Sequence, residues 1–405
     1  MAKAKKPQTS PTAKGARLAS RSGGGLPQGA LDVDALLANP DTHIIVCCGS
    51  GGVGKTTTSA ALGLRAAEQG RKVCVLTIDP AHRLAQSLGL TALDNIPRPV
   101  KGAGAGGGSL DAMMLDMKRT FDEVVESHAT PEKAQQILAN PFYVALSSSF
   151  AGTQEYMAME KLGQLYAEAG AEAGDERRWD LIVVDTPPSR SALDFLDAPD
   201  RLSSLLDGRL IKLLLAPAKG PARLLSAGFG IVTSALNKVL GAQVLTDMQT
   251  FVAAFDTLFG GFRQRAEGTY ELLKADGTAF IVIAAPEPDA MREAAYFVER
   301  LSQEDMPLAG LVVNRVSVPS MEALSLDEAE SAAHRLANGD ESDQLVAGLL
   351  HVHAEKVRVS QRENRVKRRF VAAHPAVPTV SVPALASDVH DLEGLRTVGD
   401  LLATG

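Results

Sequence analysis

The sequence predicts an α/β protein in which a mostly parallel sheet is flanked by helices and carries a helical insertion subdomain. Short apolar runs that fit buried strands alternate along the chain with segments whose apolar residues recur at helical spacing. Such alternation is typical of a parallel sheet covered on both faces. Two longer helical stretches, at about 120–175 and 200–275, interrupt the alternation. We expect them to pack at one end of the sheet.

The first strand and the helix after it enclose the strongest motif of the chain. In HIIVCCGSGGVGKTTT, residues 43–58, an apolar run leads into the spacing G-x-x-x-x-G-K-T, and the next residues predict a helix ending at Gly70. This is the context of a phosphate-binding loop, because glycines let backbone N–H groups wrap a polyphosphate and the helix N-terminus adds partial positive charge. We therefore predict a P-loop NTPase. The alternative is a Gly-rich turn with a surface lysine.

The loop supplies most of the residues that we expect to bind a nucleotide. Lys55 can reach the β- and γ-phosphates, and the Thr56 hydroxyl can ligate Mg²⁺. The predicted contacts are Gly49, Ser50, Gly51, Gly52, Val53, Gly54, Lys55, Thr56 and Thr57.

Two further apolar strands end at acids. Asp79 follows a strand at 72–78, and Asp185 ends a strand at 179–185. Because open parallel sheets bind ligands at the carboxyl ends of their strands, we expect both carboxylates near the loop. Asp185 would hold Mg²⁺ directly or through water, and Asp79 would orient or deprotonate an attacking water. The alternative role of each acid is to cap the helix that follows.

The remaining elements are assigned in chain order. Before the insertion we expect a lead-in at 26–41, a short helix at 83–90, a flexible glycine-rich loop at 97–109, a strand at 110–117 and a helix at 118–128. After it we expect a strand at 278–285, a helix at 289–304, a strand at 308–314, two or three charged helices over 322–370, a strand at 377–382 and a terminal helix.

Size and charge restrict the class of protein. The 405 residues, 45% of them hydrophobic, suffice for one large α/β domain with an insertion or for two domains. The net charge of −7 argues against general nucleic-acid binding. We assign 26–405 to the folded domain. Residues 1–25 are basic and rich in Pro, Ser and Gly, so we predict a disordered tail, either a solvated arm or a weak contact for an acidic surface.

No signal peptide and no transmembrane segment is expected from the hydropathy pattern. Cys47, Cys48 and Cys74 all lie in predicted strands and form no C-x-x-C motif, which disfavours disulfides and structural zinc. A cytoplasmic location fits these features.

With these motifs in place, the chain resembles the ArsA family of ATPases, which includes the arsenite-pump ATPase and the tail-anchored-protein targeting ATPase. The resemblance runs from about residue 43 to the C-terminus. The matching segments are GSGGVGKTT at 49–57, DPAH at 79–82, VVDTPPS at 183–189, VVNR at 312–315 and VPALASDVHDLEGL at 382–395.

The resemblance implies an ATPase with ATP and Mg²⁺ as its cofactors. It implies that Lys55 and Asp79 serve catalysis, that Thr56 and Asp185 hold the metal, and that Asn314 reads the adenine. A turn at Val382 and Pro383 would pack on the adenine ring. Members of the family usually work as dimers with two nucleotides facing each other across the interface.

Ser50 departs from the family pattern. A lysine normally stands at this position and reaches a phosphate across the dimer interface, whereas a serine cannot supply that charge. Hydrolysis is then slow, or another basic residue substitutes, or a paralogous partner in a heterodimer donates the lysine.

The cysteines and the predicted helical insertion indicate which kind of cargo the protein could carry. Cys47 and Cys48 are adjacent on one strand and point to opposite faces, so a three-thiol arsenite site is disfavoured and an anion-transporting subunit becomes the second choice. Residues 205–262 are apolar enough to form a groove for a hydrophobic client or membrane-protein partner, although ordinary core packing is the plainer interpretation. A ParA- or MinD-like positioning ATPase and a nucleotide-binding scaffold with weak turnover also remain open.

Overall fold

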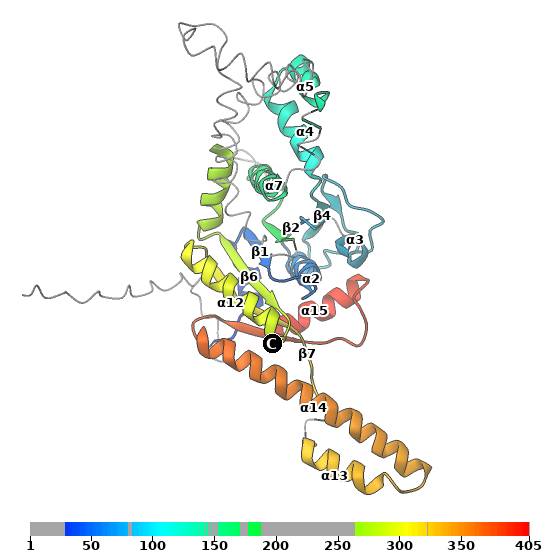
Figure 1. Ribbon diagram of the computed structural model, residues 1–405. Coiled ribbons are helices and arrows are strands. Elements are labelled where there is room, and N and C mark those ends of the chain that lie inside the picture. Colours follow the sequence, from blue (N-terminus) through cyan, green and yellow to red (C-terminus); the bar gives the residue numbers. More distant parts are fainter. Residues whose placement is uncertain are drawn as a thin grey trace, which may run out of the picture.

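The computed structural model describes residues 29–79, 83–141, 143, 144, 147, 153–170, 177–187, 264–321 and 323–404. In these ranges eight strands form one sheet in the order β3-β4-β2-β5-β1-β6-β7-β8. Every pairing is parallel except that of β3 with β4. The predicted mostly parallel α/β sheet is confirmed (Figure 1).

The strands that carry the predicted motifs lie next to one another in the centre of the sheet. β1 is flanked by β5 on one side and β6 on the other, and β2 lies beyond β5. The strands are β1 Ile44–Cys48, β2 Lys72–Thr77, β3 Arg98–Pro99, β4 Ser109–Met114, β5 Leu181–Asp185, β6 Thr278–Ala284, β7 Leu308–Val316 and β8 Thr379–Pro383. β1, β5 and β6 are buried along their whole length, as expected of strands covered by helices on both faces.

Helices cover the two faces of the sheet in separate groups. The helices are α1 Val33–Ala38, α2 Lys55–Glu68, α3 Arg83–Ser87, α4 Met117–His128, α5 Pro131–Leu138, α7 Thr153–Ala169, α12 Pro288–Gln303, α13 Leu326–Leu336, α14 Glu341–Ala373 and α15 Leu392–Thr404. One core joins α1, α2, α3 and α15 to the face that carries Cys47. The other joins α4, α5, α7 and α12 to the face that carries Cys48. Neighbouring residues of β1 therefore belong to different cores, as the strand period requires.

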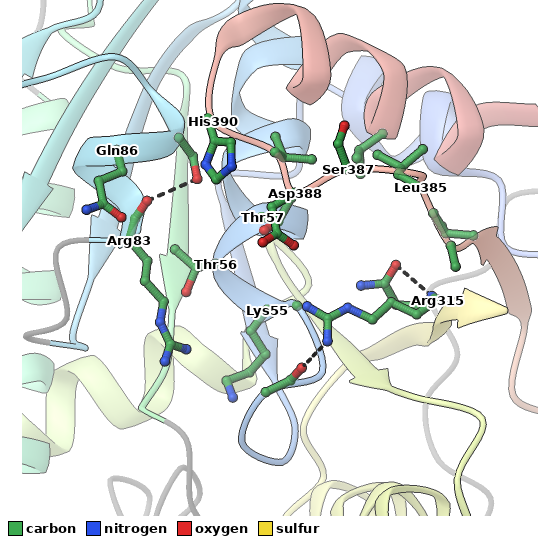
Figure 2. Close-up of a pocket in the computed structure, with 18 of the residues that line it drawn as sticks. Lys55, Thr56, Thr57, Arg83, Gln86, Arg315, Leu385, Ser387, Asp388 and His390 are labelled. Carbon is green, nitrogen blue, oxygen red and sulfur yellow. Dashed lines mark hydrogen bonds between the residues drawn. The ribbon is translucent and has the colours of Figure 1, made fainter.

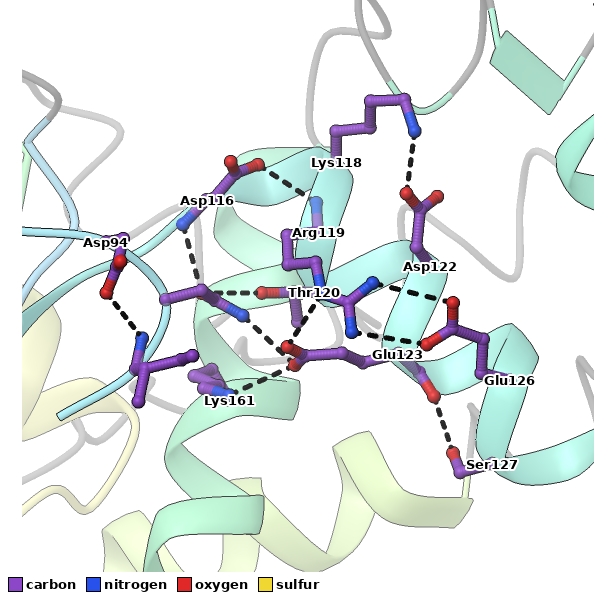
Figure 3. A network of polar contacts seen from close by, with 12 residues as sticks. Asp94, Asp116, Lys118, Arg119, Thr120, Asp122, Glu123, Glu126, Ser127 and Lys161 are labelled. Atoms are coloured by element: carbon purple, nitrogen blue, oxygen red, sulfur yellow. Dashed lines mark hydrogen bonds and ion pairs between the residues drawn. The ribbon is translucent and has the colours of Figure 1, made fainter.

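A partly buried ion pair joins helices α4 and α7. Glu123 on α4 accepts hydrogen bonds from Lys161 on α7 at 3.1 Å and from Asn95 at 3.0 Å, and Arg119 lies 3.2 Å from its other oxygen (Figure 3). The Lys161 side chain is only 8% exposed. Because an unpaired buried charge is costly, these partners fix how α4 and α7 pack.

Two ends of the molecule extend away from the sheet. α4 and α5 lie at one end, and the hairpin of α13 and α14 projects at the other (Figure 1). Ser325 and Glu328 form a capping box at the start of α13, and Asp340 caps α14 through the backbone N–H of Asp343. The charged helices expected over 322–370 are therefore two, with the predicted break between them.

Some boundaries differ from those expected. The strand predicted at 110–117 ends at Met114, because the Asp116 side chain accepts from Arg119 N and starts α4. The loop predicted at 97–109 contains the short strand β3, which pairs with β4 at the sheet edge. The basic tail, 1–25, and the apolar segment at 205–262 lie outside the described residues. The helical subdomain and the division at residue 26 therefore stay predictions.

Candidate functional site

The loop between β1 and α2 is shaped by two glycines that no other residue could replace without strain. Gly49 has φ +153°, and a Cβ there would lie 2.0 Å from the Ile283 carbonyl oxygen. Gly54 has φ +92° and forms the N-cap of α2. A Cβ on Gly54 would lie 2.2 Å from Nδ2 of Asn314. At these two glycines the loop lies so close to β6 and β7 that no room is left for a side chain.

The start of α2 presents unsatisfied backbone donors. Its N-cap Gly54 has no side chain to accept from them, and no acidic side chain lies in the first turn. Such N–H groups, together with the helix dipole, form an anion site. The loop therefore fits a polyphosphate.

Asp185 lies at the centre of a hydrogen-bonded cluster below the loop. Its Oδ2 accepts from the Thr56 hydroxyl at 2.8 Å and from the Thr77 hydroxyl at 2.9 Å, and its Oδ1 is buried without a partner. Burial raises the pKa of Asp185 to about 6, against the hydrogen bonds from Thr56 and Thr77, which act to lower it. A buried carboxylate oxygen without a partner beside a threonine hydroxyl is a donor set that suits Mg²⁺.

The Lys55 side chain is buried against the phosphate loop. It is 6% exposed, and its ammonium donates to the Ser50 carbonyl at 2.8 Å. Burial lowers the pKa of Lys55, while the carboxylates of Asp185 and Asp79 act in the opposite direction. The bond to Ser50 holds the ammonium over the loop, where a polyphosphate would lie.

A cavity of about 480 Å³ opens above the loop. Lys55, Thr56 and Thr57 at the start of α2 line it (Figure 2), together with Gly52 and Gly54 of the loop. One wall consists of Asp79, Arg83, Gln86 and Ser87, and the opposite wall of Asn314, Arg315, Val382, Pro383, Ala384 and Leu385. Residues between β8 and α15, including Asp388 and His390, also line the cavity.

The structure brings the predicted site residues to one edge of the sheet, although Gly49, Ser50, Gly51, Val53 and Asp185 do not themselves line the cavity. Asp79 lines the cavity, and its backbone N–H donates to the Thr77 hydroxyl at 3.2 Å. Val382 and Pro383 lie at the end of β8, within the strand rather than in a turn after it. Asn314 donates from Nδ2 to the Val53 carbonyl at 2.9 Å and accepts from Arg315 N at 3.0 Å, so it also braces the loop. The Ser50 hydroxyl is buried without a partner.

Several residues in and around the site were given no role from the sequence, among them Thr77, Arg315 and Arg83. Thr77 links the two acids, since its hydroxyl contacts both Asp185 and the backbone of Asp79. Arg315 donates to the Gly52 carbonyl at 3.0 Å from a left-handed backbone, φ 62°. Arg83 lines the cavity from α3. The only signal for Thr77 was a polar residue in an apolar strand, two positions before Asp79.

Comparison with known proteins decides the family. The family model described as "Anion-transporting ATPase", ArsA ATPase, matches residues 42–335, which is well over half of the chain. This chain belongs to the ArsA ATPase family. The resemblance drawn from the motifs is confirmed, and membership of this family supports an ATPase.

Relatives among characterised proteins agree with this assignment. "ATPase ASNA1 homolog 2" of Paramecium tetraurelia is 25% identical over 306 residues, covering 70% of this chain and 79% of the relative. "ATPase GET3" of Kluyveromyces lactis is 24% identical over 293 residues, covering 70% and 75%. "ATPase GET3B" of Arabidopsis thaliana is 25% identical over 305 residues, covering 71% and 68%.

Two further observations concern cargo and membranes. Burial raises the pKa of Cys47 to about 12, and it raises that of Cys48 and Cys74 as well, so none of the three thiols of this ArsA ATPase is poised as a thiolate. Among the described helices, none has both the length and the apolar character needed to cross a bilayer.

Proposed function

We propose that this ArsA-family ATPase binds Mg·ATP at the loop Gly49–Thr56 and hydrolyses it. The observation that carries the proposal is the buried Oδ1 of Asp185, which lacks a partner while Oδ2 of the same carboxylate is bonded to Thr56. Bound there, Mg²⁺ would neutralise charge on the β- and γ-phosphates. The hydroxyl of Thr56 and the carboxylate of Asp185 would hold it.

The other residues around the cavity have complementary roles in this proposal. Lys55 exchanges its bond to the Ser50 carbonyl for phosphate oxygens, and the loop glycines bind the phosphates through backbone N–H groups. Asp79 orients the attacking water and accepts its proton. Asn314 reads the adenine, which packs against Val382 and Pro383 on the same wall of the cavity.

We further infer that nucleotide state is coupled to a dimer and to a client. The Ser50 position lacks the lysine that the family resemblance places across the dimer interface, so the partner is either a second copy or a paralogue that carries that lysine. The client would be a hydrophobic segment or a membrane-protein partner bound by the helical subdomain. The expected location is the cytoplasm.

A single preparation tests both parts of the proposal. Purified full-length protein is assayed for ATP turnover with Mg²⁺ and with EDTA, and its mass is measured by sedimentation in ADP and in ATP. A hydrophobic helical peptide is titrated in both nucleotide states. We expect Mg²⁺-dependent turnover and a nucleotide-dependent change in mass or peptide affinity. Turnover that is insensitive to EDTA contradicts the metal site, and no peptide binding in any state contradicts the client.

Ser50 also favours a second candidate, a nucleotide-binding scaffold with weak turnover. A binding titration beside the turnover assay separates the two, because a scaffold binds Mg·ATP without consuming it. Ser50→Lys tests the missing charge: turnover rises if that charge limits hydrolysis, and it stays constant if another group already supplies it.

The remaining alternatives have less support. An arsenite-transporting subunit needs accessible thiolates, and the three cysteines are buried. A ParA- or MinD-like positioning ATPase would co-sediment with DNA or lipid vesicles in the presence of ATP. Absence of co-sedimentation would remove that candidate.

A further inference from the structure

We propose that Arg83 supplies, from within the same chain, the positive charge on the γ-phosphate that Ser50 cannot supply. The proposal rests on the Mg·ATP site proposed above. It assigns a catalytic group to a residue that the phosphate-loop motif does not include.

Sheet order places Arg83 on the phosphate side of the cavity. β5, which ends at Asp185, lies between β1 and β2. Arg83 begins α3, four positions after Asp79 in the segment that follows β2. Asn314 and Val382 lie on the other side of β1, on β7 and β8. With the metal at Asp185 and the base against β7 and β8, the γ-phosphate points toward the wall that carries Arg83.

Hydrogen bonding sets Arg83 apart from the other cations of the cavity. Lys55 donates to the Ser50 carbonyl, and Arg315 donates to the Gly52 carbonyl. The guanidinium of Arg83 has neither a carboxylate nor a carbonyl partner among the described residues; only its backbone carbonyl is engaged, accepting from the Ser87 hydroxyl at 3.0 Å. The side chain runs from α3 past Thr56 into the cavity (Figure 2).

A guanidinium fits the charge that develops during hydrolysis. The oxygen of water bonds to the γ-phosphorus while the bond from phosphorus to the β–γ bridging oxygen breaks, and its electron pair leaves with ADP. The proton of the water passes through Asp79 to the released phosphate. Arg83 makes no covalent bond: its N–H donors neutralise the equatorial oxygens of the transferring group. An arginine that acts in this way contributes about 10³–10⁵ to kcat.

The test compares ground-state binding with binding of a transition-state analogue. Full-length wild type, Arg83→Ala and Arg83→Lys are titrated with Mg·ADP and with Mg·ADP plus aluminium fluoride, which mimics the transferring phosphoryl group. ATP turnover is measured in parallel. Arg292→Ala on α12 is the matched control, since it removes an arginine whose side chain is 77% exposed and does not line the cavity.

We expect Arg83→Ala to bind ADP within about twofold of wild type, to bind the aluminium fluoride complex about 100-fold more weakly, and to turn over about 1,000-fold more slowly. Arg83→Lys should fall between the two, and Arg292→Ala should match wild type. Retained ADP binding also shows that the variant is folded.

Two outcomes overturn the proposal. Equal weakening of ADP and of the analogue would make Arg83 a ground-state contact, and unchanged analogue binding and turnover would remove it from the site. Failure of the underlying function looks different, because wild type itself would then bind neither ligand.

Discussion

The Thr56 hydroxyl donates a 2.8 Å hydrogen bond to Oδ2 of Asp185, which joins the first turn of α2 to the end of β5. The two residues are 129 positions apart in the chain. Their contact places the hydroxyl after the phosphate loop against a carboxylate whose other oxygen has no partner. This pair is the point at which loop, metal and nucleotide would meet.

Asp185 should make the stability of the nucleotide-free protein depend on pH. Its pKa is raised from 3.8 to about 6 in the folded state, so the folded chain holds a proton that the unfolded chain has lost. The stabilisation is fully present below pH 3.8 and is lost as pH rises through about 6. Each pKa unit corresponds to about 1.4 kcal/mol. Urea unfolding between pH 4 and 7 should show this slope in wild type and a smaller slope in Asp185→Asn; equal slopes would contradict the prediction.

Metal binding at Asp185 should show the opposite pH dependence. Mg²⁺ needs the ionised carboxylate, so affinity for Mg·ATP should fall about tenfold per pH unit below about pH 6 and be constant above it. Titrations of ATP with and without Mg²⁺ check this. In Asp185→Asn the difference between the two titrations should vanish, and a metal effect that persists would place the ion elsewhere.

Lys55→Ala should weaken Mg·ATP binding about 100-fold, because charge-assisted hydrogen bonds to two phosphates are lost. Calorimetric titration measures the change. Lys118→Ala removes an exposed lysine on α4 and should bind as wild type does. Full retention of affinity in Lys55→Ala would refute the role of the loop.

Gly54→Ala and Gly52→Ala form a matched pair in the loop. Both glycines have positive φ, +92° and +76°, but only at Gly54 would the new Cβ meet another atom, 2.2 Å away on Asn314. We expect Gly54→Ala to lower the free energy of unfolding by about 1–3 kcal/mol and to abolish nucleotide binding. Gly52→Ala should cost less in unfolding. Equal costs, measured by urea unfolding, would mean that the contact with Asn314 is unimportant.

Asn314→Ala tests whether the Asn314 side chain recognises the adenine base or only stabilises the phosphate loop. The side chain bonds to Val53 and Arg315, and one amide hydrogen is left for a ligand. If it reads adenine, ATP affinity should fall about tenfold and the preference for ATP over GTP should shrink. Competition titrations with the two nucleotides check this. An equal loss of affinity for ATP and GTP would mean that Asn314 only stabilises the loop.

Most of the fold prediction came from the spacing of residues that are close together in the sequence. The glycines, Lys55 and Thr56 lie within eight positions, and each strand-ending acid follows its own apolar run, so neither needs long-range information. The predicted boundaries failed where a local cap, such as Asp116, or an edge pairing, such as β3 with β4, decided them.

By itself the sequence determined the α/β alternation, the phosphate loop and the acids at the ends of β2 and β5, because each depends on neighbours in the chain. Only the tertiary structure decided which side chains share the cavity. Thr77 reaches Asp185 across 108 positions, and Asn314 reaches Val53 across 261. Such contacts follow from the order of strands in the sheet, which is set by packing of the two helical layers on its faces and leaves no trace in local spacing.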